Sequence, residues 1–290
     1  MVYRSFKSPL TITNMQPSDN IHLIQSLTVE KTIPLTVIFT TFNEECNIAQ
    51  ALNSVVGWVS EIIVVDSFST DNTANIVSQY KNVQFLQHLY FGPAFQKNWA
   101  IPLANNEWVL LMDADERIPM SLRNEIESLF KRMPSDKNVH FDCFWIGFTH
   151  YFAGKKVKYS GWQNDKTIRL IKRNVCRYKQ QKVHEEIYTE GLTVGKLHHT
   201  FDHYTYRNIK HFVEKQIRYA EWSAEDKDAQ TGNITYYHLF LKPLFRFMKH
   251  FILKKGFLDG YIGFIISSIA AWSVFMRYLY MYEKRNVHKL

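Results

Sequence analysis

The sequence has little cysteine and none of the signals of a secreted or repetitive protein. Its three cysteines among 290 residues, Cys46, Cys143 and Cys176, form no Cys-x-x-Cys pair. This small odd number argues against a disulfide scaffold and a zinc site, and indicates a reducing, cytoplasmic setting. There is no internal repeat, and residues 1–32 lack the charged-then-apolar order of a signal peptide, so we expect a polar N-terminal extension there.

Acidic residues are scarce in the C-terminal tail, where nine Lys or Arg residues face two acids between residues 239 and 290. That segment carries +7 of the net charge of +8. Its first part predicts a helix with a basic face and an apolar face, a pattern suited to a membrane with anionic headgroups. The basic face would hold Lys242, Arg246, Lys249 and His250, and the apolar face Leu244, Phe247, Met248, Phe251 and Ile252.

An apolar run follows at residues 261–276 and stops at Arg277. Sixteen residues are few for a membrane span, which needs about 20, so we expect a helix in the membrane plane or packed on protein. A hydrophobic oligomer interface is the alternative explanation of this tail. Nucleic-acid binding is disfavoured because the basic residues alternate with Phe, Leu and Ile and no nucleic-acid motif is present.

The N-terminal half alternates apolar strands with helices. Strands are predicted at 35–41, 61–66 and 83–87 and in the run that ends at Asp113; helices are predicted at 48–56, from the N-caps Ser69 and Thr70 to about Tyr80, and at 95–100. This β-α-β-α-β order predicts a mostly parallel sheet covered by helices on both faces. With 46% apolar residues, the chain can bury one substantial α/β core and carry an appendage.

Polar residues follow each predicted strand. Ligands of such sheets bind at the carboxyl ends of the strands, so we expect residues 41–44, Asp66, Asp71 and the 113–115 triplet to converge on one crevice. Asp113 and Asp115 are spaced i, i+2 and would project to the same side of a strand. Two carboxylates there can hold Mg²⁺ or Mn²⁺ against a diphosphate, although a solvated strand-to-turn junction also explains the triplet alone.

Four polar motifs occur in order along this half: Thr40-Thr-Phe-Asn-Glu-Glu45, Asp66-Ser-Phe-Ser-Thr-Asp71, Gln96-Lys-Asn98 and Asp113-Ala-Asp-Glu116. Further similarity occurs at Gly161-Trp162, Asp165, Arg169-Leu170, Val183-His-Glu185 and His203-Tyr-Thr-Tyr206. In order and spacing these motifs resemble those of the inverting family 2 glycosyltransferases with the GT-A fold, most nearly the bacterial lipopolysaccharide core subgroup. The resemblance covers roughly residues 33 to 282 and implies an α/β fold of the GT-A type.

The resemblance implies a role for each site residue. The donor site would comprise Thr41, Asn43, Glu44, Asp66, Asp71, Gln96, Lys97, Asp113 and Arg169, and the metal site Asp113, Asp115 and His203. Carboxylates can accept hydrogen bonds from ribose hydroxyls, and Asp115 would be the direct ligand of the metal. Lys97 and Arg169 would contact phosphate or acceptor; a solvated helix lysine is the alternative for Lys97.

An inverting transfer needs a general base for the acceptor hydroxyl. Glu185, in Val183-His-Glu-Glu186, is the first candidate, and local pairing in a strand is its alternative role. Asp165 is the second candidate, close after Gly161-Trp162, a predicted acceptor loop whose aromatic ring could stack on a sugar.

These inferences predict a metal-dependent inverting glycosyltransferase. It would move a hexose, with glucose as the first candidate, from a UDP-sugar to a lipid-linked saccharide such as lipopolysaccharide core. It would lie on the inner face of the cell membrane, with a catalytic domain at 33–237, a membrane-associating tail at 238–290 and no nucleic-acid partner. The alternatives are transfer to polyprenyl phosphate or to a capsule or exopolysaccharide intermediate, and a non-catalytic sugar-nucleotide-binding scaffold.

Overall fold

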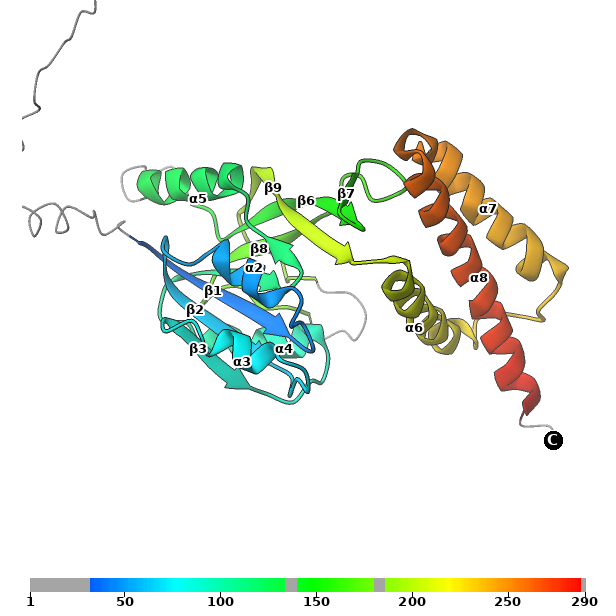
Figure 1. Ribbon diagram of the computed structural model, residues 1–290, viewed down its shortest axis with the longest axis horizontal. Helices are drawn as coiled ribbons and strands as arrows, with labels where there is room; N and C mark the ends of the chain where they lie inside the picture. Colours follow the sequence, from blue (N-terminus) through cyan, green and yellow to red (C-terminus); the bar gives the residue numbers. More distant parts are fainter. Residues whose placement is uncertain (1–31, 134–139, 180–185, 288–290) are drawn as a thin grey trace, which may run out of the picture.

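The computed structural model describes residues 32–133, 140–179 and 186–287. Within these residues the chain forms an α/β body and a helical appendage beside it (Figure 1). The predicted extension at 1–32 lies outside the described residues except for Thr32.

A nine-stranded sheet forms the centre of the α/β body, with strand order β3-β2-β1-β4-β8-β6-β9-β5 and β7 paired to β6. The strands are β1 (Ile33–Thr41), β2 (Val59–Asp66), β3 (Val83–Gln87), β4 (Trp108–Asp113), β5 (Glu116–Arg117), β6 (Cys143–Phe152), β7 (Lys155–Val157), β8 (Lys166–Lys172) and β9 (Val194–Tyr206). The first four run parallel, as predicted; most apolar residues of β1, β2 and β4 are buried, and those of β3 at the edge of the sheet are half-buried.

The second half of the sheet is mixed. β8 runs antiparallel to β4 and β6, whereas β9 runs parallel to β6. The short β5 pairs antiparallel with β9, which sets Glu116 opposite His203. The register in the parallel half sets Thr41 opposite Asp66 and Thr40 opposite Asp113. The polar residues after β1, β2 and β4 therefore lie at one edge of the sheet, and β9 approaches that edge from the other half.

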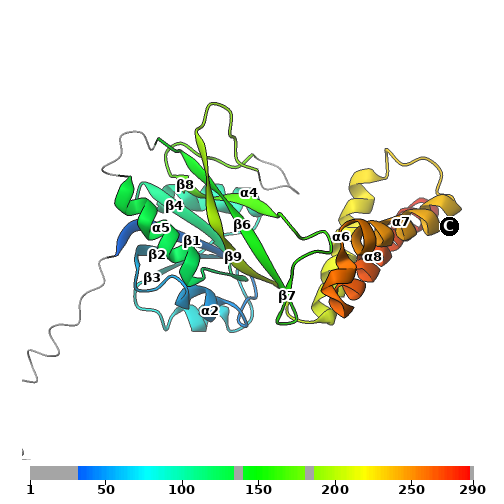
Figure 2. The same cartoon turned by 90° about the horizontal axis from the view of Figure 1, so that it is seen from above.

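Helices cover both faces of the sheet, as the alternating order predicts (Figures 1 and 2). One face packs against α2 (Ile48–Asn53), α3 (Thr73–Val77) and α5 (Met120–Arg132), and the other against α4 (Pro93–Ala100) and η1 (Ile101–Leu103). The prediction that Ser69 and Thr70 cap α3 is wrong. The helix begins after Asn72, because the Ser69 hydroxyl is engaged by Asp66 and the Thr70 amide by Asn43.

The helical appendage consists of three long segments that follow β9 (Figure 2). Its elements are α6 (Ile209–Lys227), the π-helical η2 (Tyr237–Leu241), α7 (Lys242–Met248), the π-helical η3 (Lys249–Leu253), the 3-10 turn η4 (Gly256–Asp259) and α8 (Tyr261–Val287). α8 packs against both α6 and α7, so α6 belongs to the appendage although it precedes the predicted tail.

α8 is longer than the apolar run predicted, because Arg277 does not end it. Among the described helices it alone has the length and apolar composition to cross a membrane, with a mean hydropathy of 1.5 over an 18-residue window. Packed core helices have the same properties, and one side of α8 is buried through Ile266, Val274 and Met281. Only 28% of its 18-residue apolar window is buried, so the helix in the membrane plane and the protein-packed helix both stay predictions.

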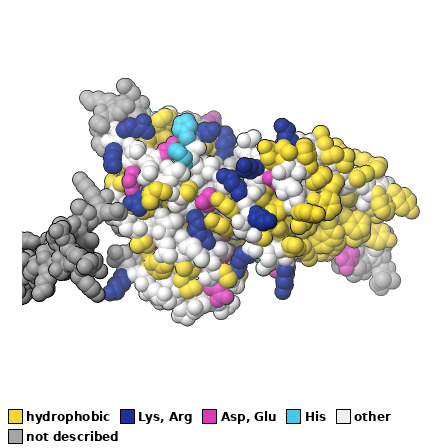
Figure 3. Space-filling view, turned by 45° about the horizontal axis from the view of Figure 1, so that its top comes forward, with side chains coloured by type: hydrophobic (Ala, Val, Ile, Leu, Met, Phe, Trp, Pro, Cys, Tyr) yellow, Lys and Arg dark blue, Asp and Glu magenta, His cyan; other side chains and the backbone are white. Residues whose placement is uncertain are grey.

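The helix around α7 is amphipathic, as predicted, but three residues of its basic face, Lys242, Arg246 and His250, are turned inward, while Lys249 is exposed. Lys242 Nζ donates to Tyr278 Oη of α8 at 2.8 Å, and His250 Nδ1 lies 2.9 Å from the Ser160 carbonyl oxygen. The outward face is apolar, and Figure 3 shows a broad hydrophobic surface over the appendage. We call this surface the apolar face; it comprises Phe240, Leu241, Leu244, Phe245, Met248, Ile252, Leu253, Phe257 and Leu258.

Candidate active site

The turns after β1 and β2 are joined by side-chain hydrogen bonds. Asn43, in the left-handed region at φ 54°, donates its amide to Ser69 Oγ at 2.8 Å and accepts from the Thr70 amide at 2.8 Å. The Glu44 amide donates to Thr73 Oγ1 at 2.9 Å. These reciprocal bonds hold the two turns in one geometry, which gives the carboxyl edge of the sheet a fixed rim.

Asp66 and Asp71 stabilise this rim. Asp66 is buried and accepts hydrogen bonds from the amide and hydroxyl of Ser69 and from Gln87. Asp71 accepts from the amides of Glu45 and Thr73 at 3.0 Å each. Burial opposes ionisation of Asp71, but these hydrogen bonds and that of the Thr73 hydroxyl lower its pKa. Both acids lie where the sequence predicts them.

Two other predicted donor residues have different surroundings. Gln96 is buried, its amide donates to Ser67 Oγ at 3.2 Å, and its oxygen lies 2.8 Å from His88 Nδ1. It therefore supports the turn after β2 from behind. The Thr41 hydroxyl is buried and has no hydrogen-bond partner within the part of the chain that the structure describes, so it is available to a ligand at this edge.

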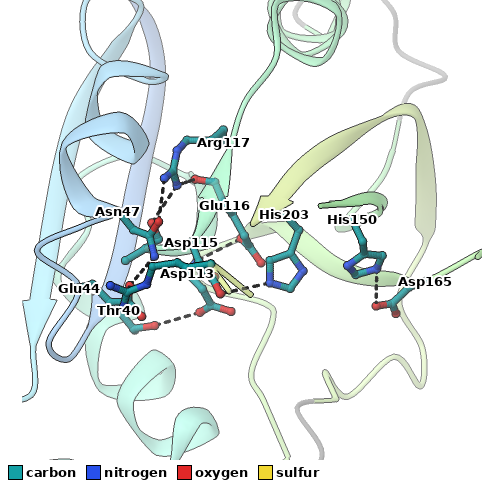
Figure 4. Close-up of polar contacts among 12 residues, drawn as sticks. Thr40, Glu44, Asn47, Asp113, Asp115, Glu116, Arg117, His150, Asp165 and His203 are labelled. Carbon is teal, nitrogen blue, oxygen red and sulfur yellow. Dashed lines mark hydrogen bonds and ion pairs between the residues drawn. The ribbon is translucent and has the colours of Figure 1, made fainter. Parts of the chain in front are cut away.

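Asp113 ends β4 and lies among cationic side chains (Figure 4). Its carboxylate is 2.7 Å from Arg169 Nη2, 3.1 Å from Lys97 Nζ and 3.1 Å from Thr40 Oγ1. Burial would raise its pKa, but Arg169 and Lys97 hold the pKa of Asp113 far below its usual range. Lys97 is only 1% exposed, so its charge is committed to Asp113 rather than presented to solvent as a helix-surface lysine.

Glu116 is a buried acid that our sequence-based selection of site residues omitted. Its carboxylate lies 2.8 Å from Arg169 Nη2 and accepts the Asp113 amide at 3.0 Å. Burial raises the pKa of Glu116 to about 7; Arg169 opposes this rise and Asp113 adds to it. Its position within Asp113-Ala-Asp-Glu116 was the available signal, but the pattern does not reveal burial.

Asp115 follows β4 in a turn and faces His203 of β9 (Figure 4). His203 Nε2 lies 3.4 Å from Asp115 Oδ2. Burial opposes ionisation of both groups, but their mutual attraction prevails: it lowers the pKa of Asp115 to about 2 and, with Glu116 and Asp113, raises the pKa of His203. The β5–β9 ladder, which sets Glu116 opposite His203, therefore brings Asp115 and His203 together, two residues that the sequence predicted for the metal site.

The residues fit a divalent cation to a limited extent. No cluster of three or more His, Cys, Asp or Glu side chains suited to a metal occurs within residues 32–133, 140–179 and 186–287. The two Asp113 oxygens contact the side chains of Lys97 and Arg169. This leaves Asp115 and His203 as the candidate metal ligands, and the buried Nδ1 of His203 has no partner in the described residues. Mg²⁺ and Mn²⁺ sites often use one or two protein carboxylates and take their other ligands from water and phosphate, so this pair suffices in kind.

A second carboxylate–imidazole pair lies beside the first. Asp165 Oδ2 is 3.2 Å from His150 Nε2, and the rings of His150 and His203 are 5.1 Å apart (Figure 4). The hydrogen bond of His150 lowers the pKa of Asp165, against the effect of burial, so this acid is ionised at neutral pH. No sequence motif indicates His150, which reaches this place because β6 pairs with β9.

A cavity of about 450 Å³ opens at these groups. We call it the acceptor-side cavity; it is lined by His150, Gly161, Trp162, Gln163, Asn164, Asp165, His203, Thr205 and Tyr206. Trp162 packs edge-on against His150, with ring centroids 5.5 Å apart. The structure thus brings Asp165, Trp162 and His203 together as one site, whereas Glu185 and its neighbour His184 lie outside the described residues.

The loop in front of this cavity is bound to the appendage. Asp259 of η4 accepts the amides of Lys158 and Tyr159 at 3.0 Å each and the Ser160 hydroxyl at 2.8 Å. The Ser160 amide also donates to the Lys254 carbonyl oxygen at 3.2 Å. We call this set of contacts the Asp259 clasp. It fixes the loop that carries Trp162 on the helical appendage.

An α/β sheet with a parallel half, a mixed second half and an acidic turn at the junction is a fold of the GT-A type. The sequence profile "Glycosyl transferase family 2" matches residues 36–189, and the chain belongs to this family. It is a glycosyltransferase, as the motifs predicted.

Several proteins are similar over most of the chain. An uncharacterised glycosyltransferase of Rickettsia typhi is 28% identical over 84% of this chain and 85% of its own. The lipopolysaccharide core biosynthesis glycosyltransferase LpsC of Rhizobium meliloti is 26% identical over 87% of this chain and 93% of its own. Among solved structures, S. aureus TarS 1–349 in complex with UDP superimposes with a TM-score of 0.44 at 18% identity, covering 87% and 91% of the two chains.

Proposed function

We propose that this glycosyltransferase transfers a hexose from a UDP-sugar, with inversion, to a lipid-linked saccharide of the lipopolysaccharide core type. The observation that carries the proposal is the junction at Asp115, where a donor edge built from three strand ends meets a cavity that contains an ionised carboxylate, Asp165. A donor and an acceptor bound on the two sides of this junction would meet at the anomeric carbon. The name of the relative LpsC supports the saccharide class of the acceptor.

The donor edge would bind the nucleotide through its preformed turns. The unpartnered Thr41 hydroxyl and the fixed backbone of Asn43 and Glu44 offer hydrogen bonds to a base or ribose. A divalent ion held by Asp115 and His203 would supply charge neutralisation for the departing diphosphate. Asp113 would orient the ribose side of the site while Lys97 and Arg169 keep it ionised.

The acceptor hydroxyl would lose its proton to a carboxylate as its oxygen attacks the anomeric carbon. Asp165 is suited to this role by its place in the cavity and by His150, which orients the carboxylate from behind. Glu185 stays a predicted base on sequence grounds. The variants Asp165→Asn and Glu185→Gln distinguish the two: the true base loses transfer by at least about 100-fold and keeps donor binding, whereas the other keeps transfer.

The apolar face of the appendage supports association with the inner membrane surface. Nine exposed apolar side chains lie together there, with exposed Lys249, Lys254 and Lys255 at its edge. A contiguous apolar surface bordered by basic residues is suited to lie in the interface of a bilayer with anionic headgroups. An enzyme on the same surface as its lipid-linked acceptor gains effective concentration.

Thermal unfolding with a panel of nucleotide sugars, with Mn²⁺ or Mg²⁺ and with EDTA, tests the donor assignment. A specific ligand raises the melting temperature by mass action. We expect one UDP-sugar to do so, with a larger shift in the presence of metal. Folded protein that responds to no nucleotide sugar would favour the non-catalytic scaffold. Transfer assays with lipopolysaccharide core, polyprenyl phosphate and capsule intermediates then distinguish the acceptor classes.

A further inference from the structure

The appendage contains a second cavity, of about 310 Å³, enclosed by α6, α7, η3 and α8. We call it the appendage cavity. It shares Trp162 and Tyr206 with the acceptor-side cavity, so the two cavities adjoin at this aromatic pair. Its polar lining comprises Gln216, Tyr219, Ser223, Lys227, Arg246, His250, Ser273 and Arg277.

Two arginines face this cavity without an acidic partner. Arg246 Nη1 lies 3.2 Å from His250 Nε2, and Arg277 Nη1 donates to Ser223 Oγ at 3.2 Å. Neither forms an ion pair with any acid in the described part of the chain. Arg277 Nε is buried and has no hydrogen-bond partner there. By contrast Arg285, further along α8, pairs with Asp228 at 2.7 Å.

Such an arrangement is unfavourable in the empty protein. Burial and the like charge of Arg277 both lower the pKa of Arg246, and no acid opposes them. Like charges in a partly buried site destabilise the fold unless an anion lies between them. The planar guanidinium fork matches a phosphate with paired hydrogen bonds, and Lys227 adds a third cation at the wall.

We infer that the appendage cavity binds a phosphate group carried by a membrane lipid, held between Arg246 and Arg277. This deepens the proposed function, on which it rests, because the cavity is lined by Arg246 and His250 of the segment that carries the apolar face, and by Trp162 and Tyr206 of the acceptor-side cavity. A phosphate bound there would place its lipid chains toward the apolar face. The saccharide attached to it would extend past Trp162 and Tyr206 toward Asp165.

The test is binding of the full chain to vesicles. Phosphatidylcholine vesicles with and without phosphatidic acid compare a phosphomonoester with a neutral surface. We expect wild-type protein to sediment with the phosphatidic acid vesicles and Arg246→Gln and Arg277→Gln to bind them about tenfold more weakly, since a hydrogen bond to a charged group contributes about 1.5–3 kcal/mol. The matched control is Lys81→Gln, which removes the same charge from an exposed site on the α/β body, outside both the cavity and the apolar face.

The source of the phosphate is distinguished by competition. Hexose 6-phosphate, free in solution, should displace the protein from phosphatidic acid vesicles if the cavity binds a phosphate on the acceptor saccharide. It should leave vesicle binding unchanged if the cavity binds the phosphate of a bilayer phospholipid. Either result supports phosphate binding. Weaker binding of Arg277→Gln to the phosphatidic acid vesicles assigns that binding to the cavity.

Two further measurements keep the outcome clear. Arg246→Lys and Arg277→Lys retain the charge and most of the packing, so they show whether lost binding reflects lost folding. Equal binding of wild type, Arg246→Gln and Arg277→Gln to phosphatidic acid vesicles overturns the inference. Hydrolysis of the UDP-sugar without acceptor is measured in parallel: its absence in the wild type contradicts the proposed function, and its persistence in the arginine variants shows an intact donor site.

Discussion

Arg169 Nη2 lies 2.8 Å from Glu116 Oε1, and this acid is completely buried. The same guanidinium nitrogen also contacts Asp113, so one arginine links two carboxylates at the junction of the sheet. Burial raises the pKa of Glu116 to about 7. At Asp113, Arg169 and Lys97 together outweigh the effect of burial and lower the pKa.

The pair leads to a prediction about stability and pH. The folded protein retains the Glu116 proton up to about pH 7, whereas its usual pKa is 4.5, so the folded state binds more protons between these values. The free energy of unfolding should therefore fall as pH rises from 4.5 to 7, by about 1 to 3 kcal/mol. Glu116→Gln should remove most of this fall.

Urea unfolding at intervals between pH 4.5 and 8 measures the effect. His203 has a raised pKa and adds a loss of stability above pH 6.5, which Glu116→Gln retains. Asp113 and Asp115 have lowered pKa values and act in the acid range, below 3.8. Glu127→Gln, in a surface pair with Arg123, is the control and should keep the wild-type slope. An equal slope in Glu116→Gln and wild type would contradict the assignment.

A second prediction concerns Asp115. Asp115→Ala should fold and lose transfer by at least about 100-fold, because the group that faces His203 and the proposed metal is removed. The variant should also lose the metal-dependent part of the thermal shift with the UDP-sugar. Asp226→Ala, at an exposed position of α6, is the control. Wild-type transfer by Asp115→Ala would exclude this residue from the metal site.

A third prediction concerns the Asp259 clasp. Asp259→Asn replaces an acceptor oxygen with a donor and should release part of the loop at residues 158–160. The substitution weakens two hydrogen bonds to a charged group. We therefore expect transfer to fall about tenfold, mainly through a higher KM for the acceptor. Donor hydrolysis should be unchanged. Asp228→Asn, which weakens a contact with Arg285 elsewhere in the appendage, should leave the KM for the acceptor unaltered.

A fourth prediction tests the apolar face. Leu244→Glu should weaken binding to anionic vesicles about tenfold or more, since burial of one leucine contributes about 1.5–3 kcal/mol and the new charge adds repulsion. Ile209→Glu is the matched control, because Ile209 is 51% exposed and Leu244 56%, yet Ile209 lies at the start of α6, outside that face. Equal binding of the two variants would rule out the apolar face as the membrane contact.

The sequence was sufficient for the parallel half of the fold. Long apolar runs that stop at polar residues correctly predict the carboxyl ends of β1, β2 and β4, although β1 and β2 begin two residues earlier than predicted; parallel pairing then requires these ends to meet. The second half was not predicted, because its arrangement depends on pairing between distant segments. His150 reaches His203 through the β6–β9 register, which no local pattern encodes.

The orientation of α7 was also beyond the sequence. Helical spacing correctly separated a basic face from an apolar one, but it does not say which face meets the neighbouring helix. Here α8 offers Tyr278 Oη to Lys242, and the 158–163 loop offers the Ser160 carbonyl oxygen to His250, so polar contacts draw these two basic residues inward. Leu244, Met248 and Ile252 are left exposed.

The Asp259 clasp fixes the distance between the active site and the apolar face. Because the loop beside Asp165 is tied to η4, the separation between the apolar face and the reacting carboxylate is set by the folded chain and not by a flexible linker. On a flat bilayer, such an enzyme would act as a ruler that selects acceptors by the distance of their free hydroxyl from the membrane. A saccharide one sugar too short or too long would present its hydroxyl at the wrong level.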